Sequence, residues 1–201
     1  MYWVVLALTM SVISSFRTPI RKCSTLLFSR GVDISLRASS SCTRSIHNNT
    51  FSITCKTPEE IETFGSKVSS VSGSSGVILL RGDLGAGKTT FTRGLIRAKF
   101  EDDDMRVTSP SYLLDNTYEY DEGKFIHHMD LYRLPTGCDL TILGIPEIYG
   151  TSLCIIEWPQ RMGNNLPTEY LDIEINIDKN ETRNIKVVAI GDSWAEKIKH
   201  I

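Results

Sequence analysis

Residues 82–89 read Gly82-Asp83-Leu84-Gly85-Ala86-Gly87-Lys88-Thr89, and this stretch decides how the chain folds. It satisfies the phosphate-binding pattern G-x-x-x-x-G-K-(S/T) at every fixed position. In such a loop the backbone N–H groups, here those of residues 84–87, wrap a phosphate. The Lys88 ammonium reaches the β and γ oxygens, and the Thr89 hydroxyl is placed to hold Mg²⁺. The motif therefore predicts a binding site for a nucleoside triphosphate.

The segments on both sides of this loop support the prediction. Residues 76–81 form a short apolar run typical of a buried parallel strand, and residues 89–99 have the pattern of a helix. The amino terminus of such a helix offers free N–H groups and a partial positive charge beneath the phosphates. Strand, glycine loop and helix together favour a phosphate loop over a chance glycine-rich turn.

The remaining pattern predicts a single α/β domain over residues 51–201, of the P-loop NTPase-like class, with a mixed sheet and flanking helices. The last two strands are expected at the edge of the sheet. We expect strands at 51–54, 76–81, 113–120, 124–129, 153–156, 170–177 and 184–190, and helices at 57–71, 89–99 and 193–200.

Residues 1–50 have the composition of a targeting presequence. The apolar stretch Val4–Ile13 has the length of a signal-peptide core, and a tract rich in Ser and Thr follows it, with six basic residues and one acid. This two-part pattern resembles the presequences of plastids derived from a secondary endosymbiont, and a mitochondrial presequence is the alternative. We therefore expect a disordered targeting segment and an organelle location, with the plastid slightly favoured over the mitochondrion.

The domain that follows is acidic. Six of the 22 Lys and Arg residues and one of the 24 Asp and Glu residues fall within residues 1–50, which leaves the domain a formal net charge of −7. Because broad nucleic-acid binding requires a basic surface, we expect any link to RNA to run through a partner. The spacing of Cys55, Cys138 and Cys154 indicates neither a disulfide framework nor a zinc site, and no membrane contact is expected of the mature form.

Two acids are candidates for the chemistry of the site. A nucleoside triphosphatase needs an acid near its Mg²⁺, and Glu157 ends a strongly apolar strand, so it is the first candidate for the second metal contact. Asp130 also ends a strand and could hold a metal-bound water or orient the attacking water. Structural alternatives stay open: a solvated strand-end glutamate for Glu157, and a capping or Arg133-paired carboxylate for Asp130.

For several other residues the sequence allows both a functional and a structural role. The Thr108-Ser109 pair lies where related nucleotide switches place a hydroxyl that senses the γ-phosphate, although a plain turn before a proline explains it nearly as well. His127 and His128 point to opposite faces of a strand, so at most one enters the site, and structural or surface roles for both are favoured. Trp158 is either a packing residue or a contact for nucleotide or partner.

Five blocks of sequence in a fixed order resemble the TsaE family, the small ATPases of bacterial-type tRNA threonylcarbamoyladenosine synthesis. The resemblance runs from about Phe51 to Ile190. Its blocks are the phosphate loop continued through Gly94, Ser109-Pro110-Ser111-Tyr112, Asp130-Leu131-Tyr132-Arg133-Leu134, Gly144-Ile145, and Glu157-Trp158-Pro159 before Leu166-Pro167. Departures are mild: Ser111 stands where threonine is common, and His128-Met129 precedes Asp130 where an aromatic residue often does.

The resemblance implies specific roles for residues of this chain. It implies ATP binding by the loop, Mg²⁺ held by Thr89 and Glu157, and an essential acid at Asp130. Arg183, matched across a variable turn, would reach the nucleotide, and the Thr57-Pro58 segment would pass near the adenine. The expected mechanism is in-line attack of water on the γ-phosphate, with Lys88 and Mg²⁺ balancing the developing charge and Asp130 positioning the water.

The resemblance also implies partners. The ATPase of this family binds a complex of the TsaD transferase and its TsaB companion, and its ATP hydrolysis supports repeated turnover. The product is N6-threonylcarbamoyladenosine at position 37 of tRNAs that read codons beginning with A, so tRNA is expected to be contacted only through the complex. Hydrolysis by the isolated protein is expected to be slow, because such switches often lack one stabilising group until a partner supplies it.

Three other functions share the phosphate loop. A small-molecule kinase would need a lid with several arginines, whereas the region after Glu157 offers only Arg161. An ATP-gated assembly factor that docks its partner without turnover is the non-catalytic alternative. A guanine-nucleotide switch is disfavoured because the guanine-reading motif N-K-x-D is absent.

Overall fold

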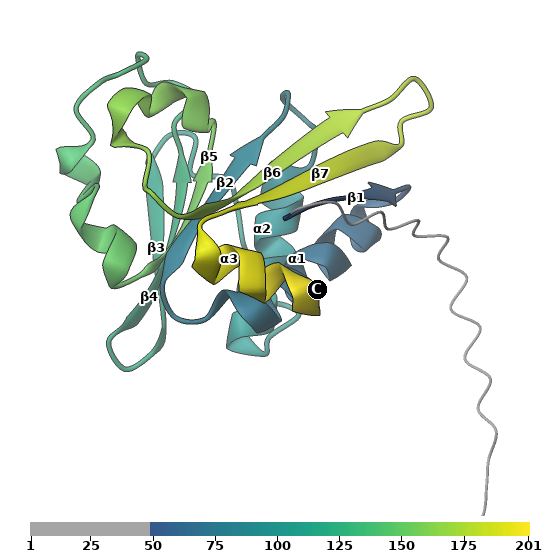
Figure 1. Cartoon of the computed structure of the whole chain (residues 1–201), viewed down its shortest axis with the longest axis horizontal. Helices are drawn as coiled ribbons and strands as arrows, with labels where there is room; N and C mark the ends of the chain where they lie inside the picture. Colours follow the sequence, from purple (N-terminus) through teal and green to yellow (C-terminus); the bar gives the residue numbers. More distant parts are fainter. Residues whose placement is uncertain (1–48) are drawn as a thin grey trace, which may run out of the picture. The chain divides into compact units, whose positions relative to one another are not determined.

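Residues 49–201 are described by the computed structural model, so the predicted presequence lies outside the described residues except for its last two positions. Within residues 49–201, seven strands form one sheet in the order β1-β7-β6-β2-β5-β4-β3 (Figure 1). The strands are β1 (Thr50–Cys55), β2 (Gly76–Arg81), β3 (Asp115–Asp121), β4 (Lys124–Asp130), β5 (Leu153–Glu157), β6 (Tyr170–Ile177) and β7 (Arg183–Ile190). The mixed sheet of the sequence prediction is confirmed.

The two apolar runs become the centre of the sheet. Strand β2 pairs in parallel with β5 on one side and with β6 on the other, and β5 pairs in parallel with β4. Residues 77–80 and 153–157 are all buried, because both faces of these strands are covered. Parallel strands covered on both faces have continuous apolar sequences, which explains why these two segments lack alternation.

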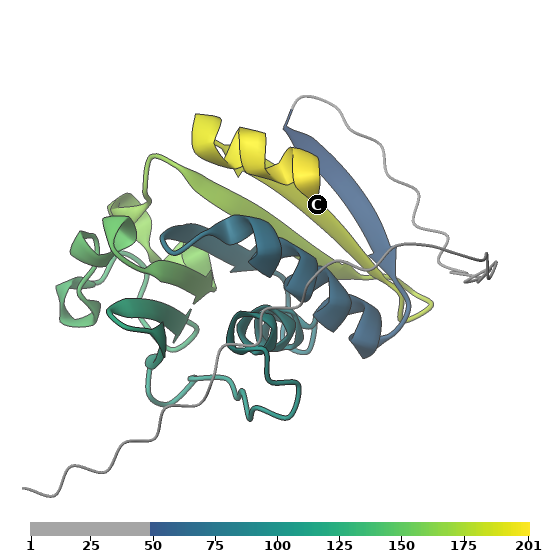
Figure 2. The same cartoon turned by 90° about the horizontal axis from the view of Figure 1, so that it is seen from below.

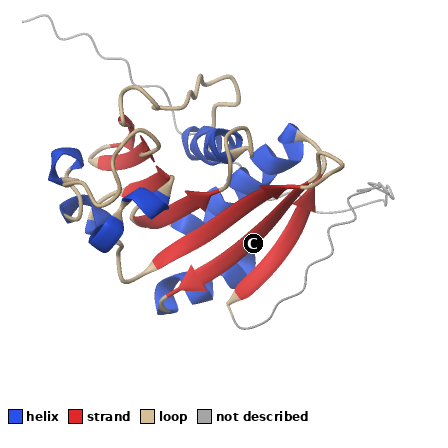
Figure 3. Ribbon diagram, turned by 90° about the horizontal axis from the view of Figure 1, so that it is seen from above, coloured by secondary structure: helices blue, strands red, loops and turns tan. Residues whose placement is uncertain are grey.

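Different structures cover the two faces. Helices α1 (Pro58–Ser72), α2 (Lys88–Phe100) and α3 (Asp192–Lys197) pack on one face, and the loop region 131–166, with its short 3₁₀ turns, packs on the other (Figures 1 and 2). Figure 3 shows the helices beside the strands that they cover. None of the helices within residues 49–201 has the length and apolar character needed to cross a bilayer.

Helices α1 and α2 cross in unusually close contact at two glycines. A Cβ atom on Gly94 would lie 2.0 Å from the carbonyl oxygen of Glu62, and one on Gly65 would lie 2.1 Å from that of Phe91. The Glu62 carboxylate reinforces the crossing by pairing with Arg93 at 2.9 Å and with Arg97 at 3.3 Å. This crossing fixes α1 against the helix that follows the phosphate loop.

The expected position of the last two strands is wrong. Strand β7 lies between β1 and β6, and β6 lies between β7 and β2, so both are interior strands. The edges within the described sheet are β1 and β3. The reason is a long-range pairing, in which Phe51 of β1 aligns antiparallel with Val187 of β7, and such a pairing leaves no local signal in the sequence.

Candidate nucleotide-binding site

The phosphate loop leaves the carboxyl end of β2 and leads directly into α2, as predicted. Two of its glycines are required by geometry. Gly82 has φ +134°, and a Cβ there would lie 2.3 Å from the carbonyl oxygen of Ile175. Gly87 has φ +113°, and a Cβ there would lie 2.9 Å from Ile61 of α1. Larger residues at these two positions would displace the loop from its place between β6 and α1.

Lys88 is buried at the start of α2, and its ammonium has well-defined contacts. Its Nζ donates to the carbonyl oxygens of Gly82 and Asp83, each at 2.8 Å, and lies 4.2 Å from the centre of the Trp158 ring. Burial lowers the pKa of Lys88, and the charges of Glu157, Asp130 and Asp83 oppose that shift. The lysine therefore stands among three carboxylates at the mouth of the loop.

Thr89 and Glu157, the two predicted metal ligands, are in direct contact. The Thr89 hydroxyl donates to Oε1 of Glu157 at 2.9 Å, across 68 positions of sequence. Glu157 is 3% exposed, so it is not a solvated strand-end glutamate. A hydroxyl and a carboxylate oxygen are ligands that suit Mg²⁺, and a pair of this kind leaves the remaining coordination positions for water and phosphate oxygens.

Asp130 stands beside Glu157 at the end of the neighbouring strand, and the two residues are register partners of β4 and β5. Its Oδ2 accepts hydrogen bonds from the Ser109 hydroxyl at 2.9 Å and the Ser111 hydroxyl at 2.6 Å. Its Oδ1 accepts from the backbone N–H of Tyr132 at 3.0 Å. Asp130 thus ties the 109–111 segment to the site, and its Oδ1 caps the following turn, which is one of the two structural roles expected for it.

The other proposed partner of Asp130 is placed elsewhere. In the part of the chain that the structure describes, no ion pair joins Asp130 to Arg133; the Arg133 guanidinium lies over the Tyr112 ring, 4.3 Å from its centre. Trp158 has left-handed backbone angles, with φ +62°, and its ring contacts Tyr132 at a centroid distance of 4.8 Å as well as Lys88. Trp158 therefore forms one wall of the loop's mouth.

Among the hydrogen bonds of residues 49–201, none joins Arg183 or the Thr57-Pro58 segment to the phosphate loop. Arg183 starts β7 opposite Ile177, at the sheet end that carries the loop, and its guanidinium donates to the carbonyl oxygen of Glu181 at 2.5 Å. Thr57 caps α1 by accepting the N–H of Glu60 at 3.3 Å. Their predicted roles toward the nucleotide stay predictions.

One residue that the sequence reasoning did not place in the site is His128. Its side chain is fully buried, and its Nε2 donates to Oε1 of Glu157 at 2.9 Å. His127 points to the other face, where its Nδ1 contacts Asp115 at 2.7 Å. The signal was available, because alternate residues of a strand share a face, so a site that contains Asp130 also receives His128.

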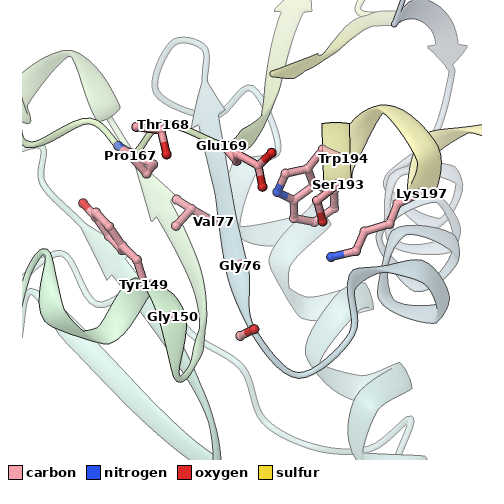
Figure 4. A pocket seen from close by; sticks show the side chains of 11 residues that line it. Gly76, Val77, Tyr149, Gly150, Pro167, Thr168, Glu169, Ser193, Trp194 and Lys197 are labelled. Atoms are coloured by element: carbon pink, nitrogen blue, oxygen red, sulfur yellow. The ribbon is translucent and has the colours of Figure 1, made fainter. Parts of the chain in front are cut away.

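A separate hollow lies at the opposite end of β2. It has a volume of about 360 Å³, and its lining includes Gly76, Tyr149, Glu169, Trp194 and Lys197 (Figure 4). The Lys197 ammonium lies 4.6 Å from the centre of the Trp194 ring. Because the phosphate loop follows the carboxyl end of β2, this hollow is not part of the nucleotide site.

Comparisons with known proteins agree with the geometry. Residues 55–185 match the family described as threonylcarbamoyl adenosine biosynthesis protein TsaE. A tRNA threonylcarbamoyladenosine biosynthesis protein TsaE from Haemophilus influenzae is 41% identical over 115 residues, which cover 56% of this chain and 70% of that protein. A protein of the same name from Bacillus subtilis is 33% identical over 139 residues, which cover 68% of this chain and 84% of that protein.

A solved structure has the same fold. The crystal structure of Bacillus subtilis YdiB aligns with a TM-score of 0.63 at 26% identity, over 77% of this chain and 95% of that chain. The family match spans the phosphate loop, Asp130, Glu157 and Arg183, which are the residues of the site described above. The chain therefore belongs to the TsaE family of proteins of tRNA threonylcarbamoyladenosine biosynthesis.

Proposed function

We propose that this member of the family is a slow ATP hydrolase whose activity supports formation of N6-threonylcarbamoyladenosine at position 37 of tRNAs that read codons beginning with A. The observation that carries the proposal is the hydrogen bond between Thr89 and Glu157. It joins the last residue of the phosphate loop, which follows β2, to a buried carboxylate at the end of β5. A loop that only needed to bind phosphate would not require that carboxylate.

The proposed division of work follows from where each group stands. The backbone N–H groups of residues 84–87 bind the phosphates, and Lys88 balances the negative charge of the β and γ oxygens. Thr89 and Glu157 would hold Mg²⁺, which when bound neutralises charge on the phosphate oxygens. Asp130, freed from one of its serines, would accept a hydrogen bond from the attacking water and fix its line of approach.

The hydrogen bonds of Asp130 are consistent with slow hydrolysis by the protein alone. Asp130 Oδ2 already accepts two serine hydroxyls, so its capacity to orient a water is reduced in this arrangement. A movement of the 109–111 segment would release that capacity. We propose that binding of a partner produces this movement, since segments of this kind are ordered or shifted by the γ-phosphate and by partners in related switches.

The proposed partner is a TsaD-type transferase with its TsaB-type companion. Large apolar side chains are exposed next to the site: Tyr112 and Leu113 follow Ser111 and are 85% and 74% exposed, and Leu84 in the loop is 65% exposed. Exposed apolar groups beside a nucleotide site are suited to a protein contact that depends on the nucleotide. Contact with tRNA would then run through the partner, in keeping with the acidic charge of the domain.

The test is reconstitution of the full chain with the partner pair, tRNA and ATP, scored for modified adenosine over many turnovers. Lys88→Ala and Thr89→Ala should abolish ATP-dependent support of modification. The control Thr63→Ala makes the same change at an exposed position of α1 and should leave it intact. If both loop variants support tRNA modification as well as the wild type does, the proposal is refuted.

A second measurement separates hydrolysis from docking. Single-turnover hydrolysis is followed by the release of phosphate, with and without the partner pair. Release that accelerates with the pair supports the proposed hydrolase. If ATP stays intact while modification still requires it, the protein is an ATP-gated assembly factor, and transfer of the γ-phosphate to a small molecule would identify a kinase.

A further inference from the structure

The strand that carries Asp130 also carries a buried imidazole that contacts the predicted metal ligand. His128 is fully buried, and its Nε2 is 2.9 Å from Oε1 of Glu157. The Thr89 hydroxyl donates to the same oxygen at 2.9 Å. Oε1 is therefore held from two directions, by β4 and by the phosphate loop, and this double contact fixes the plane of the carboxylate.

Stability alone does not account for a histidine at this position. Its second ring nitrogen, Nδ1, is buried and lacks a hydrogen-bond partner among residues 49–201. An unpaired buried polar atom destabilises a fold, whereas an apolar side chain of similar size would carry no such penalty. The neighbouring core positions follow this rule, since Ile126 and Met129 of the same strand are apolar and fully buried.

We propose that His128 is a positioning residue for the metal site: it holds Glu157 by Oε1 so that the other oxygen, Oε2, is presented to Mg²⁺. This inference rests on the proposed function, because it presupposes that Glu157 helps to bind the metal of an ATP complex. Carboxylate ligands of metals are commonly oriented by such hydrogen bonds, and loss of the orienting group typically lowers metal affinity by about 10- to 100-fold.

The geometry also explains why Thr89 alone does not keep the Glu157 carboxylate in place. When Thr89 binds a metal through its hydroxyl oxygen, its hydrogen bond to Glu157 is altered by the metal's charge and position. The histidine contact comes from a different element, the strand β4, whose register with β5 is fixed by continuous pairing. His128 therefore keeps Glu157 in place while the loop rearranges around the phosphates.

The test measures metal binding apart from turnover. Binding of a non-hydrolysable ATP analogue to the full chain is followed by calorimetry at stepped Mg²⁺ concentrations and in EDTA. His128→Leu removes the donor at similar size, and His128→Gln keeps a nitrogen donor near the place of Nε2. The matched control is His127→Leu, one position along the strand on the other face.

We expect His128→Leu to raise the Mg²⁺ concentration for half-maximal enhancement of binding by about 10- to 100-fold. Its binding in EDTA should stay within about twofold of wild type, and His128→Gln should recover most of the Mg²⁺ affinity. His127→Leu should behave as wild type. Thermal unfolding of each variant confirms that it is folded at the temperature of the measurement.

Two results would overturn the inference. If His128→Leu has the Mg²⁺ dependence of wild type, or loses binding in EDTA to the same degree as in Mg²⁺, the histidine has only a structural role. If His128→Leu does not fold, His128→Gln decides, and its failure to keep the Mg²⁺ affinity counts against the proposal. A wild-type protein that binds the analogue without any Mg²⁺ dependence would instead refute the proposed function itself.

Discussion

The crossing of α1 and α2 makes a sharp prediction about the substitution Gly94→Ala. The added methyl carbon would lie 2.0 Å from the carbonyl oxygen of Glu62 and 2.6 Å from its carbonyl carbon and Cα. These are backbone atoms inside a helix, so they cannot turn away as a flexible side chain would. Relief requires α1 to move away from α2 by about 1.4 Å to reach the ordinary carbon–oxygen separation of about 3.4 Å.

The expected free-energy change is the sum of two opposed effects. Overpacking of this kind costs about 1–3 kcal/mol and occasionally more. Alanine is favoured over glycine in a helix interior by about 1 kcal/mol. Because rigid backbone meets rigid backbone, we place the overpacking at the upper end and expect a net loss of about 2 kcal/mol, which corresponds to a fall in Tm of about 4–8 °C for a domain of this size.

The assay is thermal and urea unfolding followed by circular dichroism. The matched control is Gly150→Ala, because a Cβ there has nothing within 4 Å, and its free energy of unfolding should change by less than about 0.5 kcal/mol. Gly94→Ala should also weaken ATP binding well below its Tm, since Ile61 of α1 abuts Gly87 of the loop. If the two variants are equally stable, the helices do not cross at Gly94 in solution.

Three further predictions concern the core, the site and the presequence. Burial raises the pKa of Cys154 from 9.0 to about 12, so the stability it contributes is complete below pH 9 and is lost as the pH rises toward 12, by about 1 kcal/mol per pH unit. Urea unfolding between pH 8 and 11 should show this loss in the wild type, with a smaller slope in Cys154→Ala; equal slopes would contradict it. Replacing both Ser109 and Ser111 by alanine should raise the rate of amide hydrogen exchange across residues 108–114, while exchange in β2 serves as the unaffected reference. Residues 1–50 fused to a fluorescent protein should direct it to the plastid, and a cytosolic signal would refute the targeting proposal.

Much of this site was readable from the sequence because its parts are local. The phosphate loop is a contiguous motif, and the apolar run before Glu157 predicts both a buried strand and an acid at its end. The N-cap of α1 at Thr57 is likewise a local feature, because its hydroxyl accepts from the N–H of Glu60 three residues on. Parallel strands bring their carboxyl ends to one edge, so Asp130 and Glu157 could be expected near each other.

What the sequence did not reveal depends on contacts between distant segments. The pairing of β1 with β7 places the two predicted edge strands, β6 and β7, in the interior of the sheet, and no local pattern in the sequence signals it. The hold of two serines on Asp130 spans 19 and 21 positions and involves residues that read equally well as a turn. His128 differs, because its signal is local: it shares a face of β4 with Asp130, two residues on, so the alternation of the strand predicts that both enter the site.

The resting contacts of Lys88 have a consequence for selectivity among nucleotides. Its ammonium already has two carbonyl acceptors and an aromatic face. A phosphate that binds at the loop therefore replaces an existing hydrogen-bond partner of the lysine and does not provide its first one. Exchanging one acceptor for another yields little net free energy, except for the difference in charge between a neutral carbonyl and a phosphate oxygen. Discrimination between di- and triphosphate at this lysine is then a matter of how much negative charge the ligand brings, and salt should weaken it accordingly.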